Sequence, residues 1–243
     1  MLKAFHNSLL SLIYPQECRV CIGAVENHDD GVACHKCWAA TRIFQGSEML
    51  CNKCGAFFGD KAAPVPVSCR KCDDHRYDKA VAIGVYEKAL SASIINLKTS
   101  PVLAGRIRAA IAQTLQEIGI DNADVIVPIP LSKQRKKERG FNQAEIIAAE
   151  VSRFLRVAVD TSSLARKLHT PIHRMGMDKR ARELTVENAF EVLRPRLFEG
   201  RRILLVDDVF TSGATASFCA KVLKKNGAES VNVFTLARAV YAD

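Results

Sequence analysis

The chain has 243 residues, of which 48% are hydrophobic, and 35 Lys and Arg against 26 Asp and Glu give a formal net charge of +9. This length fits one large domain or a medium domain beside a small one, and the apolar share excludes a disordered chain. No apolar run approaches the roughly 20 residues of a membrane-spanning helix, so we expect no stable membrane insertion. The positive charge favours partners that carry phosphate, whether small metabolites or nucleic acid.

The N-terminal segment predicts a short amphipathic helix that ends near Pro15. Its apolar residues recur at helical spacing: Leu2, Phe5, Leu9, Leu12 and Ile13. We expect this helix to pack on its own domain rather than on a membrane surface, because a single basic residue accompanies it. The segment lacks the small-x-small cleavage site of a secretory signal, and we therefore expect a cytoplasmic protein.

Eight of the nine cysteines form four C-x-x-C pairs, separated by 12, 13 and 14 residues. The pairs are Cys18/Cys21, Cys34/Cys37, Cys51/Cys54 and Cys69/Cys72. A C-x-x-C turn points two thiolates at one place, and two such turns complete the tetrahedral shell of a zinc ion. The spacing therefore predicts a double zinc ribbon with two structural zinc ions, each stabilising the fold by on the order of 10 kcal/mol.

Other uses of the cysteines agree less well with the sequence. A disulfide framework requires an oxidising compartment, and a redox C-x-x-C site accompanies a thioredoxin-like βαβ unit. The spacing does not determine which pairs share a metal. The simpler arrangement joins the first pair with the second and the third with the fourth, and a crossed arrangement is the alternative.

Side chains near the ribbons are expected to have structural roles. Because eight thiolates fill both metal sites, three histidines are expected to be solvated: His28, His35 and His75. Trp38, Phe57 and Phe58 are expected to pack the ribbon against its neighbour, and the alternative is that an exposed aromatic ring stacks on a nucleic-acid base. The ninth cysteine, Cys219, is expected to be a small buried residue of a helix.

From about residue 76 the cysteine pairs stop, and apolar runs alternate with helical patterns. Strands are predicted at 80–86, 124–130, 202–206 and 230–238. Helices are predicted at 89–98, 103–119, 142–155 and 214–227. The third helix has its apolar residues on one face, namely Ile147, Val151, Phe154 and Leu155, and Gly227 ends the fourth. The alternation predicts an α/β domain over 76–243, a parallel sheet flanked by helices, behind a ribbon domain over 1–75.

The strand at 202–206 leads into two adjacent acids, Asp207 and Asp208, and then into a run of small residues from Thr211 to Thr215. Ligands of open α/β sheets bind beyond the carboxyl ends of the strands. Paired carboxylates can accept hydrogen bonds from neighbouring ribose hydroxyls. Backbone N–H groups at a helix start can hold a phosphate, and Gly213 permits a close approach. The pattern predicts a ribose 5-phosphate site.

Two simpler interpretations of these residues are less complete. Paired acids also form the pocket of receiver domains, but those acids follow the first strand and precede a separate phosphoacceptor Asp, a layout that this sequence lacks. Thr211 or Ser212 could merely cap the following helix. Capping is compatible with phosphate binding and leaves the paired acids unexplained.

The segment ILLVDDVFTSGAT resembles the 13-residue phosphoribosyl pyrophosphate (PRPP) motif of type I phosphoribosyltransferases. The segment VIVPIPLSKQRKKERGFNQAE and the four C-x-x-C pairs resemble the ComF family, which is named for its role in DNA uptake during natural transformation. The resemblance extends from YPQEC to the final strand. It implies a type I phosphoribosyltransferase-like sheet preceded by a small zinc-ribbon domain.

The resemblance also implies roles for the residues that match. Asp207 and Asp208 would be the catalytic pair and hold the ribose 2- and 3-hydroxyls, directly or through Mg²⁺. The 5-phosphate would lie against a loop of five residues: Thr211, Ser212, Gly213, Ala214 and Thr215. Pyrophosphate would lie at the turn formed by Leu131, Ser132 and Lys133.

Several residues near that turn are candidates for contact with the pyrophosphate. Arg139 and Asn142 belong to the family-like RGFNQ segment and are the stronger candidates. Arg135 is also near in sequence, whereas Lys136 and Lys137 could equally form a solvated basic face. Lys98 stands where the family often has LKY, although Thr99 and Ser100 follow it here.

One segment, TPIHRMGMDKRARELTVENAF, departs from the family pattern TPPQTGL. His173 and Arg174 replace Gln and Thr, and Asn188 matches an Asn of the family. In phosphoribosyltransferases this region forms a mobile hood over the site. The departure implies either an altered phosphoribosyl acceptor or relaxed catalysis.

Three functions remain open at this stage. In the first, the protein is a phosphoribosyltransferase of DNA uptake or nucleotide metabolism, with PRPP and Mg²⁺ bound. In the second, it senses PRPP without catalysis and binds single-stranded DNA, with DNA-uptake proteins as its partners. Six basic residues and one acid between 166 and 182 suit a phosphate backbone or a charged loop. In the third, it is a zinc-stabilised interaction platform with a vestigial pocket.

Overall fold

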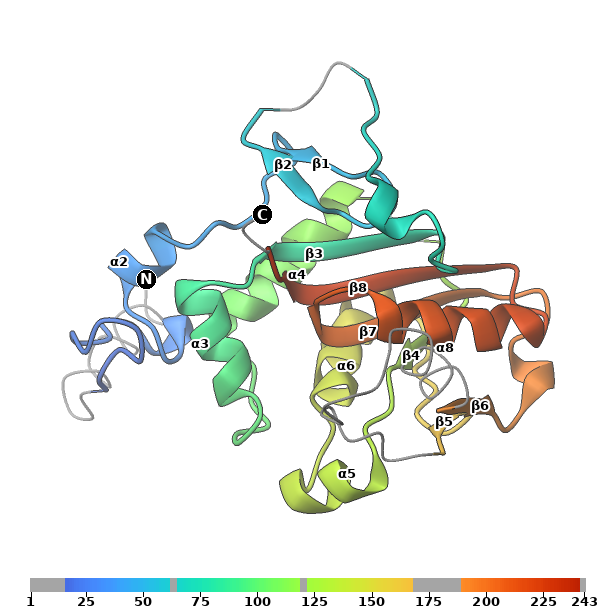
Figure 1. Cartoon of the computed structure of the whole chain (residues 1–243). Coiled ribbons are helices and arrows are strands. Elements are labelled where there is room, and N and C mark those ends of the chain that lie inside the picture. The colour runs from blue at the N-terminus through green and yellow to red at the C-terminus, as the bar shows by residue number, and fades with distance from the viewer. Residues whose placement is uncertain (1–15, 62–64, 119–121, 168–188, 241–243) are drawn as a thin grey trace, which may run out of the picture.

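The computed structural model describes residues 16–61, 65–118, 122–167 and 189–240 (Figure 1). Its centre is a parallel sheet with the strand order β3 (Lys79–Val85), β8 (Ser230–Arg238), β7 (Arg202–Phe210) and β4 (Val125–Pro128). The four predicted strands are therefore confirmed. β7 continues beyond its predicted end, so that both acids of the candidate site belong to the strand.

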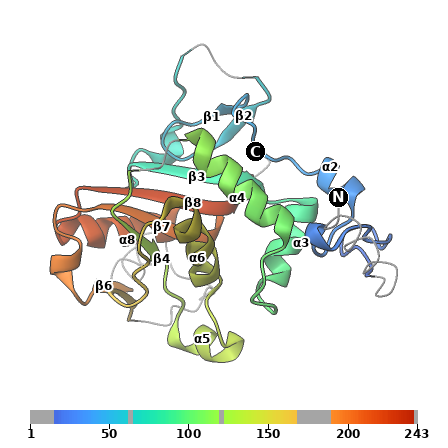
Figure 2. The same ribbon diagram turned by 180° about the vertical axis from the view of Figure 1, so that it is seen from behind.

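Helices cover both faces of this sheet, as the views from the front and from behind show (Figures 1 and 2). The first face carries α3 (Lys88–Asn96), α4 (Gly105–Ile118) and α6 (Gln143–Leu155), which share one hydrophobic cluster. The second face carries α8 (Ala214–Lys225) in a separate cluster. The predicted α/β architecture is confirmed.

Strand β7 explains why the sheet strands read as continuous apolar runs. Successive side chains of a strand point to opposite faces. Leu204 and Val206 accordingly join the cluster of α3, α4 and α6, whereas Ile203 and Leu205 join the cluster of α8. Because both faces are covered, each position needs an apolar residue, and each buried side chain stabilises the fold by about 1.5–3 kcal/mol.

The two zinc ribbons pack into different clusters. The first ribbon contains η1 (His28–Asp30) and α2 (His35–Ala39), and three of its cysteines, Cys18, Cys34 and Cys37, lie with the residues of α3 and α4. The second contains β1 (Met49–Leu50), β2 (Phe57–Gly59) and η2 (Arg70–Cys72), and its cysteines lie with β7 and α8. The strands β1 and β2 pair antiparallel, as a ribbon requires.

The segment that connects the ribbons runs along the open edge of β3. The N–H of Phe44 donates to the carbonyl of Ile83 at 2.9 Å, and the N–H of Val85 donates to the carbonyl of Arg42 at 2.9 Å. An edge strand exposes unpaired backbone groups that can recruit other chains. The connection therefore protects this edge, and it leaves the two ribbons and the sheet closely joined.

The aromatic residues of the ribbons behave differently from one another. Trp38 is 3% exposed and donates from Nε1 to the carbonyl of Asp30 at 2.9 Å, which confirms its packing role. Phe57 stacks on Phe44 with ring centroids 6.2 Å apart. The expectation for Phe58 is wrong, because it is 46% exposed. Adjacent strand residues face opposite sides, so Phe57 and Phe58 cannot both pack inward.

Helix α6 agrees with its predicted apolar face except at its end. Ile147 and Val151 are fully buried, and Leu155 packs against the same cluster. Phe154 is 43% exposed, contrary to expectation, since helical spacing assigns a face without saying how far the covering layer extends. The expected burial of Cys219 in α8 is confirmed, because its side chain is 0% exposed.

Several short elements were not predicted. These are α5 (Lys133–Arg139), η3 (Pro195–Leu197), and an antiparallel pair of β5 (Leu164–Arg166) and β6 (Phe190–Val192). The helix α5 reads KQRKKER and has no apolar period, so its only sequence signals are the caps Ser132 and Gly140. Strands of three residues are too short to show alternation.

Some predictions fall on residues 1–15 and 168–188, which lie outside the described part of the chain. They concern the N-terminal helix, most of the basic segment at 166–182, and three residues of the divergent segment: His173, Arg174 and Asn188. Among the described residues, none of the helices combines the length and the apolar character needed to cross a bilayer.

Candidate functional site

The first four cysteines converge on one point. The sulfur atoms of Cys18 and Cys37 are 3.7 Å apart, and those of Cys21 and Cys34 are 3.6 Å apart. The N–H of Cys34 also donates to Cys18 Sγ at 3.2 Å. Burial opposes a charged thiolate, but backbone N–H groups from Cys34, Val20 and Cys21 lower the pKa of Cys18 to about 6.

The last four cysteines repeat the arrangement in the second ribbon. Cys51 and Cys72 have sulfur atoms 3.7 Å apart, and Cys54 and Cys69 have sulfur atoms 3.5 Å apart. The N–H of Cys69 donates to Cys51 Sγ at 3.3 Å, which corresponds to the contact of Cys34 with Cys18. Each ribbon thus builds the same cluster from two C-x-x-C turns.

Both clusters fit a zinc ion. Within each, the four ligand atoms lie within 4.8 Å of one another. A tetrahedral zinc with Zn–S bonds of about 2.3 Å separates its sulfur ligands by about 3.8 Å, close to the distances above. The first pair shares its site with the second, and the third with the fourth, so the sequential arrangement is confirmed and the crossed one is wrong.

The two acids of the second candidate site adjoin each other on β7. The N–H of Asp208 donates to Asp207 Oδ1 at 2.9 Å, and the N–H of Val209 donates to Asp208 Oδ1 at 2.7 Å. Both residues are half-buried. Asp207 is the register partner of Thr235 on β8. The alternation of the strand gives the two carboxylates different directions.

The small-residue loop leads from β7 into α8. Gly213 precedes the first helical residue with a φ of 79°, in the left-handed region that glycine adopts without strain. The N–H of Ala214 donates to Ser212 Oγ at 3.4 Å. Thr211 and Ser212 are exposed, whereas Gly213 is buried. The loop therefore presents hydroxyl and N–H groups at the start of a 12-residue helix.

One small cavity of about 30 Å³ brings the acid and the loop together. It is lined by Asp207 of β7, Thr235 of β8, and three loop residues: Thr211, Gly213 and Thr215. Asp208 does not line this cavity and stands beside it on the strand. The structure therefore places Asp207 against the predicted phosphate loop.

Burial and the neighbouring charge of Asp208 raise the pKa of Asp207 to about 8. The N–H of Asp208 and the positive charge of Arg166 act in the opposite direction. At neutral pH, Asp207 therefore holds a proton, and its carboxyl can donate a hydrogen bond as well as accept one. A cation that entered the site would displace this proton.

Arg166 of β5 is a site residue that the sequence did not indicate. Its guanidinium carbon lies 5.3 Å from the ring centroid of Phe190 on β6. Burial and the charge of Arg135 lower the pKa of Arg166, while Asp207 raises it. A cation from the short β5–β6 pair thus stands near the acid of the cavity. The sequence around Arg166 gives no sign that this residue lies near Asp207, because the fold alone brings the two together.

The turn after β4 prepares the start of α5. Ser132 is 3% exposed and its Oγ accepts a hydrogen bond from the N–H of Arg135 at 3.3 Å, as an N-cap does. Leu131 is half-buried and Lys133 is exposed. In this turn, the Ser132 hydroxyl is therefore already used as a helix cap, whereas the Lys133 ammonium group faces solvent.

The RGFNQ segment connects this turn to α6 through hydrogen bonds. Asn142 is 3% exposed, caps α6 by accepting from the N–H of Ala144 at 3.1 Å, and donates to the carbonyl of Ile129 at 3.0 Å. Arg139 donates to Gln143 Oε1 at 2.9 Å. The Nε2 atom of Gln143 is buried and has no hydrogen-bond partner among the described residues. Asn142 is engaged within the protein, and ligand contact by Arg139 and Asn142 stays a prediction.

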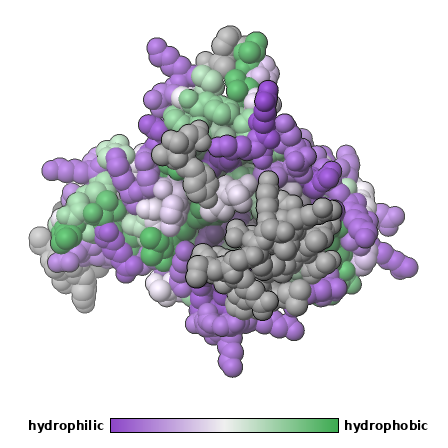
Figure 3. Space-filling view, in the orientation of Figure 1, coloured by the Kyte–Doolittle hydropathy of each residue, from purple (hydrophilic) through white to green (hydrophobic). Residues whose placement is uncertain are grey.

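Helix α5 presents a basic surface, which is hydrophilic at the bottom of the view in Figure 3. Lys136 pairs with Glu145 at 3.0 Å, and its side chain is still 55% exposed. Lys137 is exposed, and Arg135 is half-buried. Lys136 and Lys137 thus fit the solvated face that the sequence left open, and Arg135 turns further inward.

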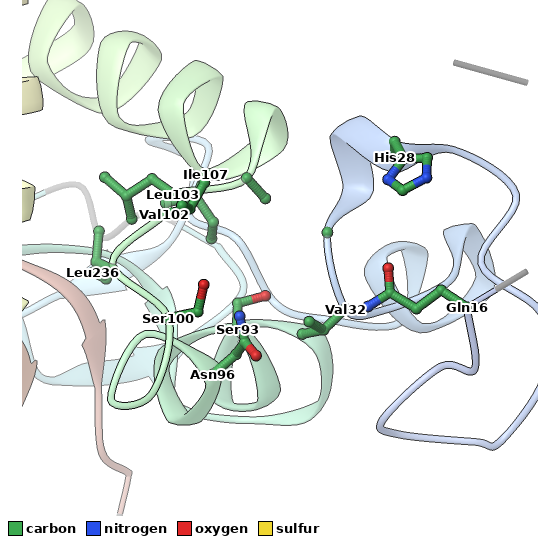
Figure 4. Close-up of a pocket in the computed structure, with 12 residues that line it drawn as sticks. Gln16, His28, Val32, Ser93, Asn96, Ser100, Val102, Leu103, Ile107 and Leu236 are labelled. Atoms are coloured by element: carbon green, nitrogen blue, oxygen red, sulfur yellow. The ribbon is translucent and has the colours of Figure 1, made fainter. Parts of the chain in front are cut away.

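A larger cavity of about 390 Å³ lies elsewhere, between the first ribbon and the helices α3 and α4 (Figure 4). It is lined by Ile107 and Leu236 on one side of the view in Figure 4, by His28 and Gln16 on the other, and by Asn96 at the end of α3. No Lys or Arg is among the described residues that line it. Lys98 lies outside both cavities, half-buried just beyond the end of α3.

The chain is similar to known proteins over most of its length. The family model of the double zinc ribbon domain matches residues 9–74. Competence protein F of Haemophilus influenzae is 30% identical over 231 residues, which cover 91% of this chain and 96% of that protein. DNA utilization protein YhgH of Escherichia coli is 30% identical over 213 residues, which cover 84% of this chain and 89% of that protein.

Similarity to a solved structure is weaker. A purine phosphoribosyltransferase from Pyrococcus horikoshii is 17% identical, with a TM-score of 0.35 over 56% of this chain and 85% of that chain. A TM-score of this size carries no argument about the ligand.

Proposed function

Because the chain belongs to the family of Competence protein F, we propose that it binds PRPP or a related ribose 5-phosphate and acts as a phosphoribosyltransferase associated with DNA uptake or nucleotide metabolism. The observation that carries the proposal is the small cavity that Asp207 shares with Thr211, Gly213 and Thr215. An acid and a helix-start loop in one cavity are the two groups that a ribose 5-phosphate needs. The weak structural match to a phosphoribosyltransferase is not part of this support.

In this proposal, the 5-phosphate lies against the loop from Thr211 to Thr215. It accepts hydrogen bonds from N–H groups at the start of α8, where the helix dipole favours an anion. The ribose hydroxyls lie against Asp207, which lines the cavity, whereas Asp208, whose carboxylate points in another direction, faces the part of the ligand outside it. A cavity of about 30 Å³ holds only the inner part of such a ligand, so the rest lies in the open region beside it.

Pyrophosphate lies at the turn formed by Leu131, Ser132 and Lys133. The exposed ammonium group of Lys133 and the guanidinium of Arg139 are its candidate cations, and Lys98, just beyond the end of α3, is a further candidate. Arg166 adds a charge close to Asp207. Asn142 acts there through its hydrogen bond to Ile129, which holds the turn.

The chemistry follows from these positions. The bond between C1 of the ribose and pyrophosphate breaks, and its electron pair leaves with pyrophosphate. The sugar becomes oxocarbenium-like, and its positive charge is favoured by the carboxylate of Asp208, and by that of Asp207 once a bound cation has displaced its proton. An acceptor nitrogen then bonds to C1 with its own electron pair and releases its proton to solvent, so no covalent nucleophile of the protein is needed. Mg²⁺ bound with PRPP would neutralise charge on the leaving group.

A second function is favoured by α5. Five of its seven residues are Lys or Arg, and Lys133, Lys136 and Lys137 are exposed. Such a surface suits the backbone of single-stranded DNA, for which the protein would act as a PRPP-sensing module without turnover. DNA-uptake proteins would then be its partners.

The first test is titration with PRPP and Mg²⁺ of the wild type, of the Asp207→Asn, Asp208→Asn double variant, and of the Asp60→Asn control on an exposed loop. We expect the wild type and the control to bind and the double variant to lose at least tenfold in affinity. Equal binding by all three proteins would exclude the acids from the site.

A second test distinguishes turnover from sensing. Labelled PRPP with Mg²⁺ and a panel of bases, ammonia and other amines should release pyrophosphate with one acceptor. Binding of PRPP without release by any acceptor, together with DNA affinity that falls steeply with salt, would favour the sensing module. DNA affinity that is independent of salt would count against it.

We also propose the division into a ribbon domain over 1–75 and a ligand-binding domain over 76–243. The family match ends at residue 74, which supports this boundary. A cytoplasmic location accords with a PRPP-binding role and with thiolates that hold zinc.

A further inference from the structure

The second zinc site is in direct contact with the end of β8. Arg238, the last residue of that strand, donates from Nη1 to the carbonyl of Cys54, and its Nη2 lies 3.4 Å from Cys54 Sγ. Cys54 is one of the four ligands of the second site. The guanidinium therefore binds the backbone and the thiolate of a metal ligand at the same time.

The same guanidinium also lies over the ring of Phe210, the residue that precedes the phosphate loop. Its carbon atom lies 4.6 Å from the centroid of the Phe210 ring. Cations over aromatic faces are attracted by the ring quadrupole, and more strongly where the pair is shielded from water. Arg238 thus connects a metal ligand to the base of the loop.

A second connection leaves the last C-x-x-C turn of this ribbon. His75 Nδ1 lies 2.6 Å from the hydroxyl oxygen of Tyr77, and the Tyr77 ring meets Phe210 edge-on, with centroids 5.7 Å apart. Tyr77 is 1% exposed. The N–H of Arg76 donates to Ser217 Oγ in α8 at 3.0 Å. The expectation that His75 is solvated is wrong, because it folds onto this cluster and is half-buried.

The loop itself rests on these residues. A Cβ atom at Gly213 would lie 2.5 Å from Phe210 Cζ and 3.0 Å from His75 Cε1. The backbone at Gly213 is therefore in close contact with the ring that Arg238 and Tyr77 hold. The path of the loop, and with it the direction of its N–H groups, depends on the second ribbon.

The first ribbon has different neighbours. Its three buried cysteines belong to the cluster of α3 and α4. Arg106 of α4 lies 5.3 Å from the centroid of the Trp38 ring and pairs with Asp30 at 3.0 Å. The cysteines of the second ribbon belong to the cluster of Phe210 and α8. The two sites have the same ligands but different positions relative to the loop.

We propose that the second zinc site positions the phosphate loop through Arg238, Tyr77 and His75, so that phosphate affinity depends on this site. The inference rests on the proposed ribose 5-phosphate function. These three residues act through Phe210 and Gly213 and do not touch the phosphate. The second ribbon is thus part of the support of the ligand site, and metal occupancy of the second site sets the affinity of the loop.

Two arginines provide a matched test, because each lies over an aromatic ring beside one zinc ribbon. Ribose 5-phosphate affinity is measured by calorimetry for the wild type, Arg238→Met and Arg106→Met, at a temperature well below each unfolding midpoint. We expect Arg238→Met to weaken binding about tenfold and Arg106→Met to change it less than twofold. Equal effects of the two variants would overturn the proposal, whereas a wild type that binds neither ribose 5-phosphate nor PRPP would refute the proposed function instead.

A conservative substitution at His75 tests whether this residue positions the loop or only stabilises the fold. His75→Gln retains a group that can hydrogen-bond the Tyr77 hydroxyl, whereas His75→Ala does not, and we expect the affinity of His75→Gln to remain closer to that of the wild type. Identical losses in both variants would contradict a positioning role.

The metal is tested directly with Cys69→Ser. We expect this variant to hold one zinc instead of two and to bind ribose 5-phosphate at least tenfold more weakly. Trp38, the single tryptophan, lies in the first ribbon, so its unchanged fluorescence shows that this ribbon is still folded. Loss of one zinc with unchanged affinity would overturn the dependence, and if Cys69→Ser does not fold, the arginine pair still decides the question.

Discussion

The contribution of Asp207 to the free energy of unfolding should fall as pH rises, and Asp207→Asn should remove this pH dependence. Burial and the charge of Asp208 raise the pKa of Asp207 from 3.8 to about 8. The folded protein therefore keeps a proton that the unfolded chain has released. The contribution is fully present below about pH 4, and it is lost as pH rises through 8.

The size of the effect follows from the window in which the two states differ. Between pH 6 and 8, the unfolded carboxyl is ionised and the folded one is largely protonated. Each pH unit changes the free energy of unfolding by at most about 1.4 kcal/mol per proton. Because Asp207 is only half-buried, water screens part of the interaction, and we expect a change of about 1 to 2 kcal/mol over this window.

The assay is urea unfolding of the wild type, Asp207→Asn and Asp60→Asn at intervals between pH 6 and 8. Groups that all three proteins share cancel in the differences, and Asp60, at 77% exposure, controls for the loss of one negative charge. Relative to the wild type, Asp207→Asn should gain stability as pH rises, whereas Asp60→Asn should run parallel. A constant difference between Asp207→Asn and the wild type across the window would refute the assignment of the proton to Asp207.

Three further predictions test the metal sites, the edge of the sheet and an ion pair. Removal of metal by a chelator should release two zinc ions per chain and unfold both ribbons, since each site stabilises the fold by on the order of 10 kcal/mol. A zinc-binding dye measures the release and circular dichroism measures the unfolding; a chain that keeps its structure without metal would contradict this prediction. Gly84→Ala should lower the free energy of unfolding by about 1–3 kcal/mol, because its Cβ would lie 2.3 Å from the Arg42 carbonyl oxygen. Gly59→Ala, whose Cβ would contact only Met49 at 3.9 Å, should leave the free energy of unfolding in urea nearly unchanged. Asp124 accepts hydrogen bonds from the Arg202 guanidinium at 2.8 and 3.1 Å, which hold its pKa well below the usual range. Asp124→Asn should therefore destabilise the protein fully at pH 5 to 7, and the loss should shrink as pH falls below 3.8, the ordinary carboxyl pKa, toward the depressed folded pKa. Urea unfolding that gives the same loss at pH 5 and pH 2 would exclude this linkage.

The zinc ligands and the sheet were predictable because both leave local patterns. A C-x-x-C turn fixes the relative position of its two thiols within four residues, and only the pairing of turns required the fold. The strands of the sheet are covered on both faces, so ILLV at 203–206 reads as a buried strand without knowledge of its neighbours. The link from the acids to the loop was also local, since Asp207 and Thr215 are separated by a single turn.

The surroundings of the site were not predictable, because they come from distant segments. Arg166 acts on Asp207 from a three-residue strand that lies about forty positions earlier. His75 and Cys54 meet Gly213 and Arg238 across more than a hundred residues of sequence. No periodicity marks such residues, and the expectation of a solvated His75 failed because a lone histidine beside a filled metal site gives no sign of what packs on it.

These distant contacts also decide how the two proposed functions should be separated. Deletion of residues 1–75 looks like the natural way to ask whether the ribbons bind DNA. Such a deletion would remove the connection that covers the edge of β3 and the contacts of the second ribbon with Phe210 and the phosphate loop. Loss of DNA binding or of PRPP binding after truncation would then report a damaged sheet domain as readily as a missing ribbon. Substitutions on α5, such as Lys136→Gln with Lys137→Gln, leave those contacts in place, so a loss of DNA affinity with unchanged PRPP affinity would assign the DNA contact to that helix.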